Sequence, residues 1–343
     1  MPQRKFLPSM DLRVSIRKKL RDFTLDVDFA VRDEVFALLG ASGCGKSMTL
    51  KCIAGIETPD AGKIILNGRT LFDSEKKINL PPQARRAGFL FQNCALFPNM
   101  TVAENILFAA TGDKFSKLKE NLSRFQLDGL ENAYPSRLSG GQLQRVALAR
   151  VLTSHAEFLL LDEPFSALDS HLKWQLELQL AEIFKLYGAA ILVSHDRGEI
   201  FRLANSVAVM NAGKLDAQGP VREIFARPTT RAAAILTGCK NISAAKKISD
   251  KKIFAEDWQL ELTVANVPDD LKFCAVHAAD IQFCAADCNT FKLSVARVIE
   301  DTDAFIFLLE KNLRAEVPKL ARKNFGGEVT LHFPPERILL LCR

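Results

Sequence analysis

The spacing of hydrophobic residues changes along the chain. From about residue 35 to residue 187, short apolar runs alternate with segments of helical period, which is typical of a parallel sheet covered by helices. The buried strands predicted from these runs are residues 35–39, 87–91, 158–161 and 190–193. Ahead of them, residues 12–16 and 23–30 alternate with the two-residue period of an antiparallel edge. The pattern predicts an α/β fold with a mixed sheet.

Capping residues mark where helices begin. Thr101 precedes Glu104 by the three-residue spacing of a capping box, and Ser139 stands ahead of the helical run 142–152. Further on, two short closing helices are predicted, at residues 221–226 and 231–236.

The pattern changes again beyond about residue 241, where short strand-like runs follow one another without a helical period. Runs of this kind predict a small β-barrel-like domain. We therefore expect two domains, residues 1–240 with a helical subdomain at about 95–155, and residues 241–343.

Composition and charge narrow the functional classes. The 343 residues are 48% hydrophobic and 25% charged, as in ordinary folded domains, and the net charge of +6 comes from the first 240 residues. The isoelectric point of 8.8 falls short of the strongly basic surface of a nucleic-acid-binding protein, so no nucleic-acid partner is expected. No apolar run approaches the length that crosses a bilayer, which predicts a cytosolic protein.

The eight cysteines lack paired CxxC spacing and predict reduced thiols rather than a disulfide framework. Cys284 and Cys288 supply only two of the four ligands that a zinc site needs, so a metal role for them is the weaker hypothesis.

The clearest chemical motif is a phosphate-binding loop between a predicted strand and a predicted helix. It fits GxxxxGK[ST] and consists of Gly40, Ala41, Ser42, Gly43, Cys44, Gly45, Lys46 and Ser47. Glycines let the backbone amides point at a polyphosphate, and the following helix adds its positive N-terminal end. Lys46 would bridge the β- and γ-phosphates, and Ser47 would ligate Mg²⁺.

An apolar strand that ends in two carboxylates is the second motif. Asp162 can hold Mg²⁺ and belongs with Ser47 as a metal ligand. The adjacent residue on an extended chain points elsewhere, which lets Glu163 face an attacking water as its general base or orienter.

The third motif is a serine and two glycines at a helix start. Ser139, Gly140, Gly141 and Gln142 make another anion site, 23 residues before Asp162. A nucleotide whose phosphates occupy the first loop does not need this second site in the same subunit. The economical interpretation is a head-to-tail dimer in which each copy completes the other's ATP site.

Together and in this order, the motifs resemble the ATP-binding cassette (ABC) family from about residue 12 to residue 238. The resemblance implies three further roles. Gln92 matches the Q-loop glutamine that contacts metal and water, residues 166–169 match the D-loop that ends in Asp169, and His195 matches the switch histidine. Catalysis would then rest on Glu163, His195, Gln92 and Lys46, with Gln92 also near the metal.

Two positions depart from the family pattern. Met48 stands where a hydroxyl residue commonly contacts the α-phosphate, which leaves a backbone amide for that contact. No Tyr or Trp lies between residues 16 and 28 to stack on adenine, so Phe23 or Leu20 would have to serve.

Within the family, residues 71–98 look most like the ATPase subunit of molybdate importers. The implied partners are a second copy, an integral membrane permease and an extracytoplasmic substrate-binding protein, with the chain peripheral on the cytoplasmic face of the membrane. The permease would dock on residues 93–101. The C-terminal region resembles a TOBE domain, in which Ser294 and Arg297 are candidate oxyanion contacts.

Three alternatives stay open. A sulfate, ferric-iron or polyamine importer would share every catalytic residue. A soluble ABC ATPase acting on ribosomes or DNA normally carries two cassettes or a long coiled-coil insertion, and this chain shows neither. An oxyanion sensor with a vestigial ATPase is disfavoured by the intact Lys46, Asp162, Glu163 and His195.

Overall fold

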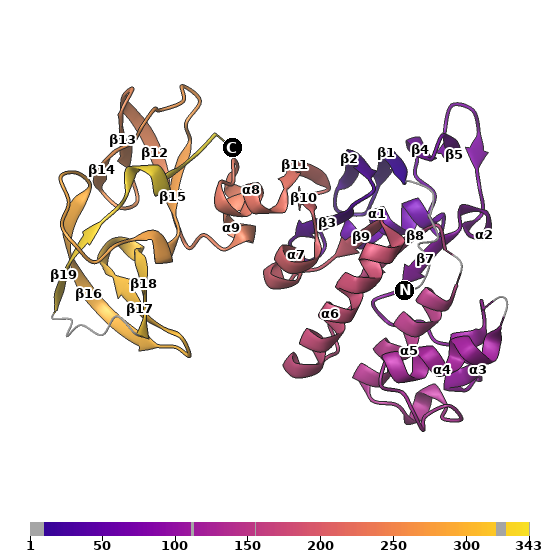
Figure 1. Ribbon diagram of the computed structural model, residues 1–343. Helices are drawn as coiled ribbons and strands as arrows, with labels where there is room; N and C mark the ends of the chain where they lie inside the picture. The colour runs from indigo at the N-terminus through magenta and orange to yellow at the C-terminus, as the bar shows by residue number, and fades with distance from the viewer. Residues whose placement is uncertain (1–9, 111–112, 155, 320–326, 343) are drawn as a thin grey trace. The chain divides into compact units, whose positions relative to one another are not determined.

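The computed structural model describes residues 10–110, 113–154, 156–319 and 327–342. Tertiary contacts divide the chain into two units, Met1–Val221 and Arg222–Arg343. Figure 1 shows the helices and strands of both.

Eleven strands in the described part of the first unit form one sheet, in the order β6-β5-β4-β1-β2-β11-β10-β3-β9-β8-β7. Their bounds are β1 Asp11–Lys19, β2 Thr24–Arg32, β3 Val35–Gly40, β4 Ala61–Leu66, β5 Arg69–Asp73, β6 Ile78–Asn79, β7 Ala87–Leu90, β8 Phe158–Asp162, β9 Ala190–Val193, β10 Ser206–Asn211 and β11 Lys214–Pro220. The pairs β7·β8, β8·β9, β9·β3 and β3·β10 are parallel, while β1 pairs antiparallel with β2 and β4. The four predicted buried strands and the antiparallel edge are confirmed.

Helices cover both faces of this sheet. They are α1 Lys46–Ala54, α2 Pro82–Arg85, α3 Val102–Leu107, α4 Lys114–Arg124, α5 Gly140–Thr153, α6 Ser170–Tyr187 and α7 Arg197–Leu203, with a 3-10 turn at Pro135–Arg137. The strand β8 shows why its sequence is apolar throughout. Phe158 and Leu160 pack in the core with residues of α1, whereas Leu159 and Leu161 pack in the core with α5 and α6.

The helices α3, α4 and α5 lie together at one end of the first unit (Figure 1). α3 begins with the predicted capping box, in which Thr101 accepts from the Glu104 amide and Glu104 accepts from the Thr101 amide. The start of α5 has the same arrangement, because Ser139 and Gln142 cap each other. Both helix starts therefore have defined partners for their free backbone amides.

The second unit is rich in strands. Two sheets occur among its described residues, β14-β13-β12-β15-β20 and β18-β17-β16-β19. Their bounds are β12 Asn241–Ser249, β13 Lys252–Ala255, β14 Leu260–Thr263, β15 Phe273–Val276, β16 Thr290–Glu300, β17 Ala304–Leu309, β18 Arg314–Pro318, β19 Glu328–His332 and β20 Leu339–Leu341, with 3-10 turns at Ala278–Asp280, Glu310–Asn312 and Pro335–Arg337. Trp258, Phe307 and Phe333 fill the core, so the predicted all-β domain is present.

The two closing helices are α8 Val221–Ala226 and α9 Arg231–Thr237. Ala234 of α9 is buried in one cluster with Ala275 and Leu339 of the β-rich unit. By tertiary contacts α9 therefore belongs with the β-rich unit, whereas the sequence analysis placed it in residues 1–240.

In the part of the chain that the structure describes, no helix combines the length and the apolar character needed to cross a membrane.

Candidate functional site

The loop between β3 and α1 has the geometry of an anion site. Gly43 and Gly45 have φ values of +79° and +110°, which residues other than glycine rarely adopt. The Lys46 amine is buried within the loop and donates to Gly40 O at 2.8 Å and to Ala41 O at 2.9 Å. The loop therefore gathers backbone amides, a helix N-terminus and one ammonium around the same space.

Beside this loop, the Ser47 hydroxyl donates to Asp162 Oδ1 at 3.0 Å. Asp162 is only 3% exposed, and this burial raises the pKa of its carboxyl, opposed by the Ser47 hydrogen bond. A hydroxyl and a buried carboxylate that share one point are hard oxygen donors of the kind that Mg²⁺ prefers. The residues present thus fit the implied metal ion.

Glu163 follows β8 in a left-handed conformation, with φ of +51°. The turn directs its carboxylate to two neighbours. Gln92 Nε2 donates to Glu163 Oε2 at 3.3 Å, and His195 Nδ1 lies 3.2 Å from Glu163 Oε1. Gln92 comes just after β7 and His195 just after β9, so three neighbouring parallel strands deliver these side chains at their carboxyl ends.

The structure therefore brings together most of the predicted catalytic residues. Gln92, predicted also as a metal ligand, has its amide nitrogen on Glu163, while Ser47 and Asp162 contact each other. His195 is 68% exposed and Glu163 is largely covered, so the carboxylate lies below a histidine at the surface.

The helix start at Ser139 does not join this cluster. Ser139 and Gly140 are exposed, and the hydrogen bonds that the described residues give Ser139 stay within the first turn of α5. A Cβ on Gly141 would lie 3.2 Å from Leu168, so the glycines allow the D-loop to pack closely. Asp169 caps α6 by accepting from the Leu172 amide at 2.9 Å.

Phe23 lies beside the phosphate loop, because a Cβ on Gly45 would be 3.4 Å from its ring. The Leu20 amide donates to Phe23 O at 2.9 Å, which closes the turn between β1 and β2. Met48, which stands at the position of the missing hydroxyl, is partly buried against the core. An aromatic ring therefore lies next to the loop.

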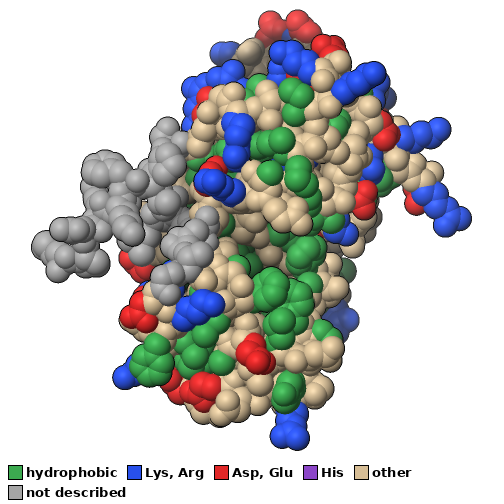
Figure 2. Space-filling model, turned by 90° about the vertical axis from the view of Figure 1, so that its right-hand side faces the viewer, with side chains coloured by type: hydrophobic (Ala, Val, Ile, Leu, Met, Phe, Trp, Pro, Cys, Tyr) green, Lys and Arg blue, Asp and Glu red, His purple; other side chains and the backbone are tan. Residues whose placement is uncertain are grey.

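The segment 93–101, predicted to dock a permease, is partly packed into the molecule. Leu96 packs against the core of the helical region, and the ring of Phe97 contacts that of Phe108 at a tilt of 45°, with ring centroids 4.4 Å apart. Phe108 itself is 59% exposed, and Phe115 and Tyr134 of the same region are exposed as well. Hydrophobic side chains gather on the lower half of the face in Figure 2, at the level of α3 and α4.

Two polar residues of α5 contact the loops after β7 and β8 but were not among the predicted site residues. Gln144 is buried against the turns at Glu163 and Ala167, and Arg150 donates to the carbonyls of Cys94 and Ala95. Both are polar residues on a helix whose buried positions are mostly apolar, which was a signal, but the pattern does not reveal their partners.

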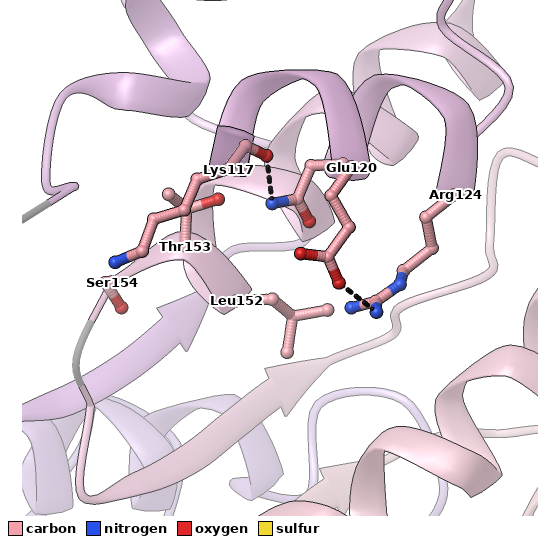
Figure 3. Close-up of a pocket in the computed structure, with 7 residues that line it drawn as sticks. Lys117, Glu120, Arg124, Leu152, Thr153 and Ser154 are labelled. Carbon is pink, nitrogen blue, oxygen red and sulfur yellow. Dashed lines mark hydrogen bonds and ion pairs between the residues drawn. The ribbon is translucent and has the colours of Figure 1, made fainter. Parts of the chain in front are cut away.

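A separate cavity of about 210 Å³ lies between α4 and the end of α5 (Figure 3). Glu120 and Arg124 form an ion pair of 2.6 Å at its rim. The amide oxygen of Asn121 has no partner among the described residues, yet it is closed off from solvent and cannot receive a ligand from the cavity. None of the predicted ATP-site residues lines this cavity.

The candidate oxyanion contacts of the second unit lie on β16, which pairs with β17 and β19. Ser294 and Arg297 are exposed on β16, and the Ser294 amide donates to the Glu310 carboxylate at 3.1 Å. A carboxylate at this amide repels an oxyanion. Cys284 and Cys288 belong to no group of three metal-binding side chains among the described residues.

A phosphate loop after β3, a buried acid closing β8 and a separate helical region on this mixed sheet define the P-loop fold of an ABC ATP-binding cassette, followed by a small all-β unit. Residues 24–166 match the family model of the ABC transporter.

The curated relatives include the spermidine/putrescine import ATP-binding protein PotA of Methylococcus capsulatus, which is 41% identical over 233 residues. That match covers 66% of this chain and 58% of the relative. The putrescine transport ATP-binding protein PotG of Escherichia coli is 41% identical over 225 residues, with 63% of this chain and 58% of the relative covered. The chain thus spans rather less than two thirds of the length of these relatives.

Solved structures agree on the fold. The ATP-binding cassette MJ0796, dimeric in a post-hydrolysis state with ADP and Pi, has a TM-score of 0.54 and 26% identity, and the match covers 62% of this chain and 99% of that one. A bacterial Atm1-family ABC exporter with ATP bound has a TM-score of 0.59 over 69% of this chain and 43% of the other. Its identity is 21%, so that likeness concerns the fold alone.

Proposed function

We propose that this chain is the ATP-hydrolysing subunit of an ABC importer and that it works as a homodimer with two MgATP at the interface. The observation that carries the proposal is the position of Glu163. Its carboxylate lies between Gln92 and His195, one residue beyond the acid that contacts the serine of the phosphate loop.

The phosphate loop would bind the triphosphate through its amides, with Lys46 supplying a positive charge at the β- and γ-phosphates. Ser47 and Asp162 would hold Mg²⁺. The ion, when bound, would neutralise charge on the phosphate oxygens. Phe23 offers an aromatic face next to the loop for the adenine.

Glu163 would orient the attacking water and accept its proton. The Gln92 amide fixes one carboxylate oxygen, and the other lies beside the exposed His195. The carboxylate is largely covered, and a water bound beside it would be held for attack on the γ-phosphate. His195, which lies beside the Glu163 carboxylate, would contact the γ-phosphate.

The open helix start at Ser139 supports the shared site. Its hydroxyl accepts a hydrogen bond from the Gln142 amide and can still donate one. Ser139 and Gly140 at this helix start are exposed and could meet a partner. A second copy placed head to tail would set this turn against the γ-phosphate in the loop of the first. The dimeric state of the solved cassette MJ0796 is consistent with this arrangement.

For the solute, the relatives favour the polyamine alternative over molybdate, because PotA and PotG carry polyamine import in their names. The comparisons do not support molybdate. We propose a polyamine such as spermidine or putrescine, moved by a separate permease that receives it from an extracytoplasmic binding protein. The chain would sit on the cytoplasmic face of that permease.

Hydrolysis of MgATP by the purified full chain tests the enzymatic part. Glu163→Gln should retain ATP binding, lower turnover by roughly 10²- to 10⁴-fold and accumulate dimers, as measured by phosphate release and light scattering. Glu157→Gln is the matched control, since Glu157 pairs with Arg86 just before the same strand. Undiminished turnover of Glu163→Gln would refute the role of this carboxylate.

Uptake by cells tests the solute. Cells that lack the gene should lose uptake of labelled putrescine or spermidine, and the wild-type chain should restore it while Glu163→Gln should not. If labelled molybdate uptake follows the gene instead and polyamine uptake does not, the solute assignment is overturned although the ATPase assignment stands.

A further inference from the structure

Gln144 is a polar residue on the buried side of α5. It is 2% exposed, and the next five residues of the helix are also buried. An unpaired amide in such a place costs on the order of 1–3 kcal/mol, so its partners are expected to matter.

Both ends of the Gln144 amide are bonded to loops of the catalytic site. Its Nε2 donates to Glu163 O at 3.0 Å, and its Oε1 accepts from the Ala167 amide at 3.1 Å. One partner is an acceptor and the other a donor, which fixes the orientation of the amide. A single side chain thus joins the turn after β8 to the D-loop.

The bond to Glu163 acts on a strained residue. A left-handed φ is uncommon for a residue with a long side chain and persists only where surrounding bonds hold it. Here the Glu163 amide donates to Val193 O at 2.9 Å, and its carbonyl accepts from Gln144 and from Ser166. Because this φ decides where the carboxylate points, the bonds that hold it also aim the carboxylate.

We infer that Gln144 is a positioning residue for ATP hydrolysis, which holds the backbone turn that directs the Glu163 carboxylate toward the nucleotide. Through the Ala167 amide, it also ties this turn to the D-loop. Gln144 touches no reacting atom in this role. The inference rests on the proposed ATPase function.

The test uses the full chain with Gln144→Met, which keeps the side-chain volume and removes both hydrogen bonds. If the Glu163 carboxylate is no longer held in position, kcat for MgATP should fall about tenfold or more. A tenfold loss equals ~1.4 kcal/mol of activation free energy. The KM and the nucleotide affinity should stay within about twofold, because the phosphate loop does not contact Gln144. Gln144→Ala serves as the second variant if the first does not fold.

Thr153→Val is the matched control. Thr153 is buried on the same helix, and its hydroxyl donates to Ala149 O at 2.6 Å, away from the catalytic turns. This variant should lose stability to a similar extent but keep its kcat. A readout of kcat against KM therefore separates positioning from general destabilisation.

Two results would overturn the inference: a folded Gln144 variant with wild-type kcat, or an equal loss of kcat in Thr153→Val. Failure of the proposed function is distinguishable, because the wild-type chain itself would then release no phosphate from MgATP.

Discussion

Arg85 is a fully buried arginine at the end of the phosphate-loop helix, and we predict that Arg85→Ala strongly destabilises the first unit. It is 0% exposed, and its guanidinium donates to Cys52 O at 2.8 Å and Ile53 O at 3.0 Å, the last carbonyls of α1. It also donates to Leu80 O at 2.8 Å and to Asn79 Oδ1 at 2.7 Å. All four recorded acceptors are neutral.

The magnitude follows from these bonds. Hydrogen bonds to a charged group contribute about 1.5–3 kcal/mol each, but they are not additive, and water entering the emptied space would satisfy some of the carbonyls. The guanidinium cation also interacts favourably with the negative C-terminal end of the α1 dipole. A net loss of about 3–5 kcal/mol is expected, which lowers the melting temperature by on the order of 10 °C for a unit of this size.

Thermal unfolding of the full chain measures this, with the first unit's transition identified by its shift on adding MgATP. Arg86→Ala is the neighbouring control, because Arg86 is exposed and its ion pair with Glu157 is worth less than about 1 kcal/mol. The reasoning is refuted if the two variants melt within 2 °C of each other, a margin of about one kcal/mol or less.

Two further predictions concern the nucleotide site. Burial raises the pKa of Asp162, so its contribution to stability is present below the unfolded pKa and is lost as pH rises through the folded one. Asp162→Asn should therefore raise the melting temperature of the nucleotide-free chain by a few degrees at neutral pH and remove the stabilisation by MgATP; calorimetry showing a less stable variant would contradict this. Ser139→Arg and Lys46→Ala chains should each be inactive, yet their mixture should regain phosphate release, because the mixed dimer holds one complete site. A mixture that stays inactive argues against sharing.

The sequence predicted the centre of the sheet because its strands are buried on both faces. Residues 158–161, for example, are apolar at every position, and β8 is indeed covered by helices on both sides. The phosphate loop was equally readable, since its glycines and lysine are adjacent in the chain. Local pattern suffices wherever the partners of a residue lie within one loop.

Other elements left no such pattern. Strand β6 has only two residues, and the next two strands of the sheet, β5 and β4, are short and partly polar, so no period of two emerges. The expected boundary at residue 240 relied on the change from helix-period to strand-like segments. The packing of α9 depends instead on long-range contacts, because Ala234 is buried with Ala275 and Leu339 of the β-rich unit. The contact of Glu163 with His195 joins residues 32 positions apart. It depends on the left-handed conformation of Glu163, which no sequence motif predicts.

Helix α5 makes several of the contacts that could not be predicted from the sequence. At its start α5 presents Ser139 to the surface, and Gln144 donates to the carbonyl of Glu163. Near its end, Arg150 donates to the carbonyls of Cys94 and Ala95. Those two residues also have left-handed φ values, +59° and +43°, so the arginine stabilises a strained segment just beyond the Q-loop position. Because close-packed interiors transmit strain, we expect a shift of its first turn to act on both attached loops. The segment that we expect to meet the permease and the base that we expect to cleave ATP are thus linked through the same backbone.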